Sequence, residues 1–107
     1  MCQQFDVYRN PSERTRLIHP FIMVIQHDYY GDLSTRLVLP LSSHAYLNGY
    51  YHQATPLVNI DFQTVVINTP SMTSIDKKKL SNRYFVCNLR HARSSVISAI
   101  DALVTNT

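Results

Sequence analysis

The sequence has little glycine, little cysteine and few acidic residues. Its 2 glycines in 107 residues exclude collagen-like repeats and glycine-rich phosphate-binding loops. The only cysteines, Cys2 and Cys87, lack the paired spacing of zinc ligands or of a disulfide framework, so a reduced, cytoplasmic protein is expected. The 7 acidic residues are too dispersed to suggest a pair of catalytic carboxylates.

Long hydrophobic runs and catalytic motifs are absent as well. No segment approaches the roughly 18 apolar residues of a membrane span, and no signal for export is seen at the N-terminus, so we expect no membrane association. No serine lies in a Gly-x-Ser-x-Gly elbow, and the 5 histidines lack metal-binding spacing. The sequence therefore gives no indication of a catalytic centre, a metal or a cofactor.

What is present is a largely hydrophobic chain with an excess of positive charge. Hydrophobic residues make up 45% of the chain, and its length predicts one domain over residues 1–107. Its 10 Lys and Arg residues give a net charge of +3. Lys77, Lys78, Lys79 and Arg83 form a basic cluster in which Asp76 is the nearest acid. Such a cluster attracts acidic proteins or nucleic acid, although a solvated surface has the same composition.

Apolar segments separated by turn-forming residues predict strands over the first two thirds of the chain. The first is expected to be half-buried, with Phe5 and Val7 facing inwards. Pro40 donates no backbone hydrogen bond and is expected at an edge or a bulge. Residues 42–55 are expected to form a loop with one helical turn, and residues 71–82 a basic connection. The predicted strands cover residues 5–8, 21–25, 36–41, 57–60, 64–67 and 83–87.

The last segment has the period of an amphipathic helix. Its apolar stripe consists of Leu89, Ala92, Val96, Ala99, Ile100 and Leu103. Asn88 is a suitable N-cap. Strands followed by one terminal helix predict an α+β fold, a curled antiparallel sheet with the helix packed against it. The opposite face of the helix is polar and consists of Ser94, Ser98, Asp101 and Thr105.

Five short motifs resemble the CcdB family in the same order along the chain. They are Gln4-Phe5-Asp6-Val7-Tyr8, Gln26-x-Asp28 with Thr35–Leu41, Pro56-x-Val58-x-Ile60, Thr69-x-x-Met72-Thr73-Ser74-Ile75, and Ala99-Ile100-Asp101-x-Leu103. The resemblance implies a small SH3-like antiparallel barrel with a C-terminal α-helix, a fold shared with MazF, and a homodimer. It also implies the toxin of a type II toxin–antitoxin system, which binds the A subunit of DNA gyrase without catalysing a reaction. An antitoxin with an acidic, disordered tail would neutralise it.

The resemblance also assigns candidate site residues. Target binding would involve Tyr29, Tyr30, Ser94, Ser98, Asp101, Thr105, Asn106 and Thr107. Antitoxin binding would involve Lys77, Lys78, Lys79 and Arg83. The family usually ends in Gly-Ile, often after Trp, whereas this chain has no Trp and continues as Thr105-Asn106-Thr107. We therefore expect poor trapping of gyrase, because large aromatic anchors dominate interface energetics.

Two alternatives remain at this point. The protein could be an mRNA endoribonuclease of the MazF type, with Arg16 or His19 as general acid or base. It could also be a degenerate family member that no longer harms gyrase. In the favoured interpretation, nucleic acid is reached only through the target or through a repressor complex with the antitoxin.

Overall fold

The computed structural model describes residues 2–44 and 54–105. The expectations for Asn106, Thr107 and most of the 42–55 loop lie outside the described residues. The described strands are β1 (Asp6–Arg9), β2 (Phe21–Val24), β3 (Thr35–Ser43), β4 (Leu57–Ile60), β5 (Gln63–Ile67), β6 (Thr73–Asp76) and β7 (Phe85–Asn88). Short 3-10 turns are η1 (Asp28–Tyr30), η2 (Thr69–Ser71), η3 (Lys77–Lys79), η4 (Asn82–Tyr84) and η5 (Arg90–Ala92), and the α-helix is α2 (Arg93–Val104).

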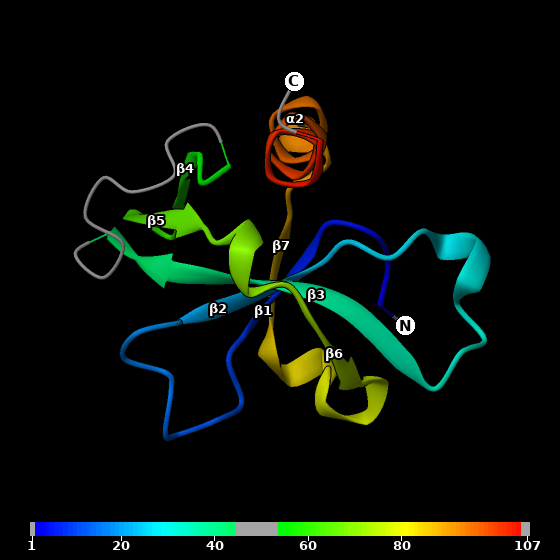
Figure 1. Ribbon diagram of the computed structural model, residues 1–107. Coiled ribbons are helices and arrows are strands. Elements are labelled where there is room, and N and C mark those ends of the chain that lie inside the picture. Colours follow the sequence, from blue (N-terminus) through cyan, green and yellow to red (C-terminus); the bar gives the residue numbers. More distant parts are fainter. Residues whose placement is uncertain (1, 45–53, 106–107) are drawn as a thin grey trace.

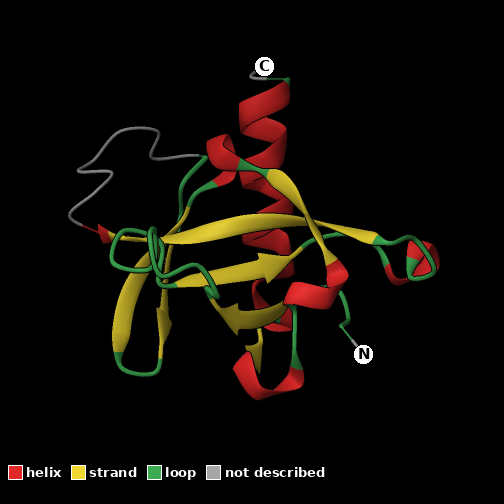
Figure 2. Cartoon of the chain, turned by 90° about the horizontal axis from the view of Figure 1, so that it is seen from below, coloured by secondary structure: helices red, strands yellow, loops and turns green. Residues whose placement is uncertain are grey.

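The strands form one curled antiparallel sheet in the order β4-β5-β3-β2-β1-β7 (Figure 1). The long strand β3 pairs with β2 along one edge. Its other edge is shared by two strands, because β6 pairs with residues 35–38 and β5 with residues 41–43. Figure 2 shows α2 as a much longer helix than the turns that connect the strands. The expected α+β fold with a curled antiparallel sheet and a C-terminal helix is confirmed.

Both faces of the central strands are covered. On the α2 side, a core cluster includes Val7, Met23, Leu39 and Val96. On the opposite side, Tyr8, Ile22, Val24 and Val38 pack against Leu80 of the segment after β6. Strand β2 is therefore buried along its whole length, as its continuous apolar run predicts. The expectation that β1 is half-buried is wrong, because Asp6 and Tyr8 face this second cluster and are also buried.

Pro40 lies in the central strand β3, which corrects the expectation of an edge or a bulge. It pairs with Ile22 of β2 on one side. On the other side, β5 ends at Ile67 opposite Leu41, and β6 begins at Thr73 opposite Val38. The Pro40 carbonyl accepts a hydrogen bond from the Asn68 backbone N–H at 2.9 Å across this junction. The N–H and C=O of a strand residue point to the same side of the strand. The N–H that proline lacks would therefore point to the junction between β5 and β6, where no hydrogen bond of either strand pair requires it.

The predicted hairpin is present with a tighter turn than expected. Strand β5 starts at Gln63, so Asp61 and Phe62 alone connect it to β4. Both have positive φ, 55° and 66°, which is the pattern of a type I′ turn. Asn-Gly or Asp-Gly usually occupies this turn, and here its second position is a fully exposed phenylalanine.

The boundaries of two other elements also differ from expectation. The predicted connection over residues 71–82 contains strand β6, which is exposed except at Ile75 and therefore lacks an apolar signal. The α-helix begins at Arg93, and Ala92 is its N-cap. Asn88 instead accepts a hydrogen bond from the Arg90 N–H at 2.8 Å, at the start of η5. The side chain thus has a capping role one short turn before the expected helix.

Candidate functional site

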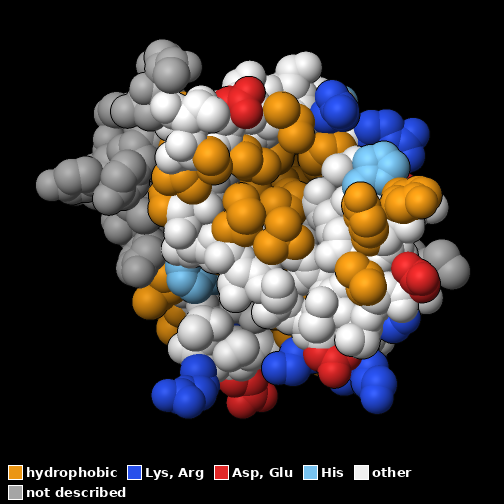
Figure 3. Space-filling view, turned by 45° about the vertical axis from the view of Figure 1, so that its right-hand side comes forward, with side chains coloured by type: hydrophobic (Ala, Val, Ile, Leu, Met, Phe, Trp, Pro, Cys, Tyr) orange, Lys and Arg blue, Asp and Glu red, His pale blue; other side chains and the backbone are white. Residues whose placement is uncertain are grey.

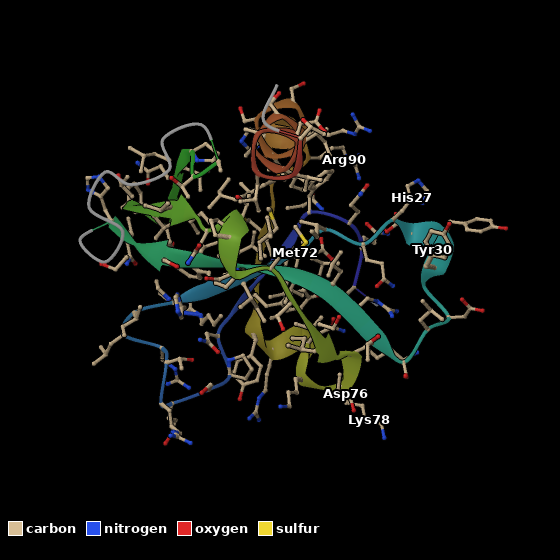
Figure 4. All side chains as sticks on the ribbon, viewed as in Figure 1. His27, Tyr30, Met72, Asp76, Lys78 and Arg90 are labelled. Carbon is tan, nitrogen blue, oxygen red and sulfur yellow. The ribbon has the colours of Figure 1, made fainter. Side chains whose placement is uncertain are left out.

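Turn η1 presents two aromatic side chains to solvent. Tyr29 is 79% exposed and Tyr30 is 52% exposed. Their rings meet edge to face with centroids 5.0 Å apart. His27 precedes the turn, and its Nδ1 accepts a hydrogen bond from the Tyr29 N–H at 3.0 Å. The predicted pair is therefore a projecting aromatic surface, and Figure 4 shows Tyr30 at the end of the arm that leads to β3.

The Gln26-x-Asp28 motif fixes this turn to the rest of the sheet. Gln26 Nε2 donates to the Tyr30 carbonyl at 3.0 Å, while Gln26 Oε1 accepts from the Leu37 N–H at 3.2 Å. Asp28 Oδ1 accepts from the Gln4 N–H at 2.8 Å. One side chain thus ties the turn to β3, and the other ties it to the N-terminal segment.

The buried guanidinium of Arg36 secures the chain that follows the turn. Arg36 is 3% exposed, and its donors meet the carbonyl oxygens of Leu33 at 2.6 Å, Thr35 at 2.9 Å and Gly31 at 2.5 Å. No Asp or Glu in the described part of the chain forms an ion pair with it. Backbone carbonyls therefore stabilise this cation, and in return the loop from Gly31 to Thr35 is held in one conformation.

The predicted polar face of α2 is exposed, as expected. Thr105 hydrogen-bonds the Asp101 carbonyl through its Oγ1 at 2.8 Å, so its hydroxyl proton is used within the helix. Asn106 and Thr107 lie outside the described residues. Two apolar residues that the sequence analysis did not assign to the site, Ile97 and Val104, are 38% and 72% exposed. Their spacing of seven positions places them on one flank of the polar face, a signal that was available in the sequence.

The structure does not bring the two halves of the predicted target site together in one chain. Turn η1 lies at the far end of the β3 arm, whereas α2 stands over the middle of the sheet (Figure 1). Met72 lies between the sheet and α2 in Figure 4 and packs against the main core cluster. In Figure 3 the right-hand side of Figure 1 is turned forward, and hydrophobic side chains gather in a patch on that face of the molecule. Target contacts from η1 and α2 would therefore span a broad surface.

The basic cluster follows β6 on the opposite side of the sheet. Asp76 caps η3 by accepting a hydrogen bond from the Lys78 N–H at 2.9 Å. Arg83 lies over the ring of Tyr84, 4.9 Å from its centroid, and donates to the Tyr84 hydroxyl at 2.9 Å. Lys78, Lys79 and Arg83 line one cavity, so three of the four predicted antitoxin-binding residues are brought together; Lys77 is outside this lining. No motif in the sequence predicted the cavity itself.

The two residues considered for ribonuclease chemistry have other contacts. His19 Nδ1 lies 2.6 Å from Ser42 Oγ, and burial lowers the pKa of His19. Arg16 Nε donates to the Asn10 carbonyl at 3.3 Å. Among residues 2–44 and 54–105, no Asp or Glu lines the cavity beside His19. Among the residues that the structure describes, no cluster of three or more His, Cys, Asp or Glu residues could hold a metal.

Comparison with known families decides the assignment. A family model described as CcdB protein matches residues 4–106, nearly the whole chain. The chain belongs to the CcdB family. None of the curated proteins matches it significantly. CcdB proteins are toxins of toxin–antitoxin systems that act on DNA gyrase without catalysing a reaction, so the resemblance seen in the sequence is confirmed at the level of the family.

The CcdB family match includes η1, the basic cluster and α2. Its motifs have clear structural roles here, since Gln26 and Asp28 hold the aromatic turn and Arg36 holds the loop beside it. No helix in residues 2–44 or 54–105 is long and apolar enough to cross a membrane.

Proposed function

We propose that this CcdB-family protein is a cytoplasmic toxin that acts as a homodimer by binding the A subunit of DNA gyrase. The observation that carries the proposal is the aromatic pair Tyr29–Tyr30 on a turn fixed by three side chains. Tyrosine buries a large area at low cost in conformational entropy, and a fixed turn loses little further entropy on binding. The exposed face of α2 supplies a second contact, with short polar groups beside Ile97 and Val104.

The C-terminal departure from the family lowers the expected strength of this interaction. Thr105 follows the end of the helix at the place where the family often has Trp. Truncating an interface hot spot typically costs about 2 kcal/mol or more, which corresponds to about thirtyfold in affinity. The unmodified protein should therefore trap cleaved gyrase–DNA complexes weakly. Asn106 and Thr107 are part of the same C-terminal departure from the family.

A gyrase cleavage assay tests the proposal directly. The combined substitution Thr105→Trp, Asn106→Gly and Thr107→Ile should raise trapping by about thirtyfold if the helix face is otherwise suitable. Adding Tyr29→Ala and Tyr30→Ala to that variant should remove most of the gain. Leu17→Ala is the matched control, because Leu17 is 93% exposed on the β1–β2 loop, outside the proposed contact. Strong trapping by the unmodified protein would contradict the role given to the C-terminal tail, whereas no gain from the restored tail in a folded protein would count against the α2 face as a target surface.

Neutralisation is assigned to an antitoxin with an acidic, disordered tail. Lys77, Lys78, Lys79 and Arg83 are all exposed and offer a concentrated positive charge. Binding should weaken with added salt, mainly through slower association, because the attraction acts at long range. Nucleic acid is then reached through gyrase or through a repressor complex with the antitoxin. In the described part of the chain, His19 contacts Ser42 and Arg16 donates to the Asn10 carbonyl, and neither contact gives specific support for a ribonuclease.

A further inference from the structure

A cavity opens on the face of the sheet opposite α2. Its volume is about 640 Å³, within the range of ~300–1,000 Å³ that holds small-molecule ligands. In Figure 1, the β1–β2 loop and the segment of η3 and η4 both extend to this side of the sheet, and residues of these two segments form the walls. The floor is apolar and comes from three strands, through Ile22 of β2, Val38 and Pro40 of β3, and Ile75 of β6.

The wall after β6 carries all of the formal positive charge. Lys78, Lys79 and Arg83 line it, and no Asp or Glu is among the lining residues. Asp76 is the nearest acid along the chain, and its Oδ1 already accepts the Lys78 N–H. Cations without a paired carboxylate around a concave site favour an anion with several oxygen acceptors, and phosphate groups are the common ligand for clustered Lys and Arg.

The same wall offers a flat surface for a ring. Tyr84 is half-buried, packs against the second core cluster, and has the Arg83 guanidinium over its ring. The Arg83–Tyr84 hydrogen bond at 2.9 Å keeps the two groups together. The apolar floor beside them would be covered by a planar aromatic ligand, whereas a free phosphate ion would leave it exposed to water.

The opposite wall contributes hydroxyl groups. Ser12 and Thr15 of the β1–β2 loop line the cavity, and Asn10 holds this loop by donating to Thr15 Oγ1 at 2.9 Å and to the His19 carbonyl at 2.8 Å. Because Thr15 Oγ1 accepts that bond, its own proton is available for an acceptor. The site thus combines cations, an aromatic face, an apolar floor and polar groups that can orient a ligand.

We propose that this cavity binds a small phosphorylated ligand with a planar aromatic ring, of the size of a mononucleotide. Lys78 and Lys79 contact the phosphate, and the ring lies over the apolar floor beside Tyr84. An acidic peptide would satisfy the cations and leave the floor uncovered, so the small ligand is the better fit. Lys78, Lys79 and Arg83 also belong to the proposed antitoxin surface, and the ligand and the acidic tail would therefore exclude each other.

The test measures binding of AMP and GMP to the unmodified protein by calorimetry and by NMR chemical-shift changes. Adenosine, inorganic phosphate and a polyglutamate peptide are the comparison ligands. AMP or GMP should bind at least about tenfold more tightly than adenosine or phosphate alone, because each lacks one half of the contacts. Neither gyrase nor antitoxin is present, so the result is independent of the proposed toxin function.

Two matched pairs of variants locate the site. Lys78→Ala with Lys79→Ala should weaken nucleotide binding by about tenfold or more, whereas Lys77→Ala, on the same turn and outside the lining, should change it less than twofold. Thr73→Phe should block the cavity, whereas Thr64→Phe, at another exposed strand position, should not. All five positions are exposed, so these changes leave the fold intact, which circular dichroism would verify.

Other outcomes would overturn the proposal. Equal losses in the Lys77 variant and the Lys78–Lys79 variant would show a diffuse basic surface. Binding of phosphate or polyglutamate as tight as that of AMP, with no effect of Thr73→Phe, would show that the cavity takes no ring. Absence of binding at millimolar nucleotide would also exclude the site.

Discussion

At the scale of single residues, this protein uses buried polar side chains to hold exposed ones in place. Arg36 binds three carbonyls of the loop beside η1. Asp6 is buried and accepts hydrogen bonds from the Gln3 N–H at 2.8 Å and from Asn88 Nδ2 at 2.9 Å, which connects the N-terminal segment to β7. A buried polar group that loses its hydrogen-bond partner costs free energy. Replacing one of these few side chains should therefore lower the stability of the protein measurably.

Replacing Arg36 tests this directly. Arg36→Met keeps much of the buried side-chain volume and removes all three donors. A hydrogen bond to a charged group contributes about 1.5–3 kcal/mol, and water can replace part of it because Leu33 and Thr35 are exposed, so we expect a loss of about 3 kcal/mol in the free energy of unfolding. Urea denaturation measures that loss, and hydrogen exchange should show faster opening of residues 29–35 than of β2. Arg14→Met, at an exposed position, is the control and should be neutral; an equal effect of the two variants would contradict the assigned role.

His19 provides a prediction on pH. Burial lowers its pKa in the folded protein, so the unfolded chain binds the proton more readily and stability falls as the pH drops below about 6.5. His19→Asn keeps a polar group near Ser42 Oγ and does not titrate. The variant should lose less stability than the unmodified protein between pH 7.5 and pH 5, as measured by urea midpoints. The other histidines are the same in both proteins, so they contribute equally to the two pH profiles. Parallel profiles would show that His19 does not cause the loss of stability at low pH.

At the scale of elements, most strands and the helix could be predicted, because their apolar patterns report burial. The patterns failed where burial depends on neighbours that the sequence does not show. Strand β6 is almost wholly exposed and gives no apolar signal, and β1 is buried on both faces only because the segment around Leu80 covers it. Pro40 looked like an edge residue, since nothing in the sequence reveals that two strands share one side of β3.

The β4–β5 hairpin offers a stabilising change. Asp61 and Phe62 both have positive φ, which Asp and Asn tolerate but which costs about 1–2 kcal/mol for a side chain such as that of Phe62. Asp61→Asn with Phe62→Gly should therefore raise the free energy of unfolding by about 1 kcal/mol, read from the urea midpoint. Phe62→Ala alone removes the exposed ring without relieving the backbone, and it should not stabilise the protein. A stabilisation of equal size in both variants would point to the ring instead of the turn.

At the scale of the whole molecule, the parts that matter for function come from segments far apart in the chain. The cavity combines the β1–β2 loop, three strands and the η3–η4 segment, so no single sequence motif could have predicted it. The aromatic turn and the helix face were predicted correctly as exposed residues, and the sequence could not show that they lie apart. In the proposed homodimer, a second copy would extend the binding surface across this separation.

The dimer is expected to use the end of α2 at Leu103, which is not part of the proposed target contact. Leu103 is 39% exposed at the end of the helix. A symmetric interface would bury it against the same residue of a second copy. Leu103→Glu should convert the dimer to a monomer in light scattering at tens of micromolar, whereas Leu17→Glu, on the β1–β2 loop, should leave the dimer intact. An unmodified protein that is monomeric at that concentration would contradict the expectation.

The pairing of β1 with β7 has a consequence for how the protein becomes active during synthesis. Asp6 and Asn88 face each other in this pair although they are 82 positions apart. Strand β1 therefore receives its second neighbour only after residue 88 has left the ribosome. At about 5–20 residues per second, the nascent chain spends several seconds without a complete sheet. For the proposed toxin, this delay gives a co-produced neutralising partner time to be present before the first active molecule has folded.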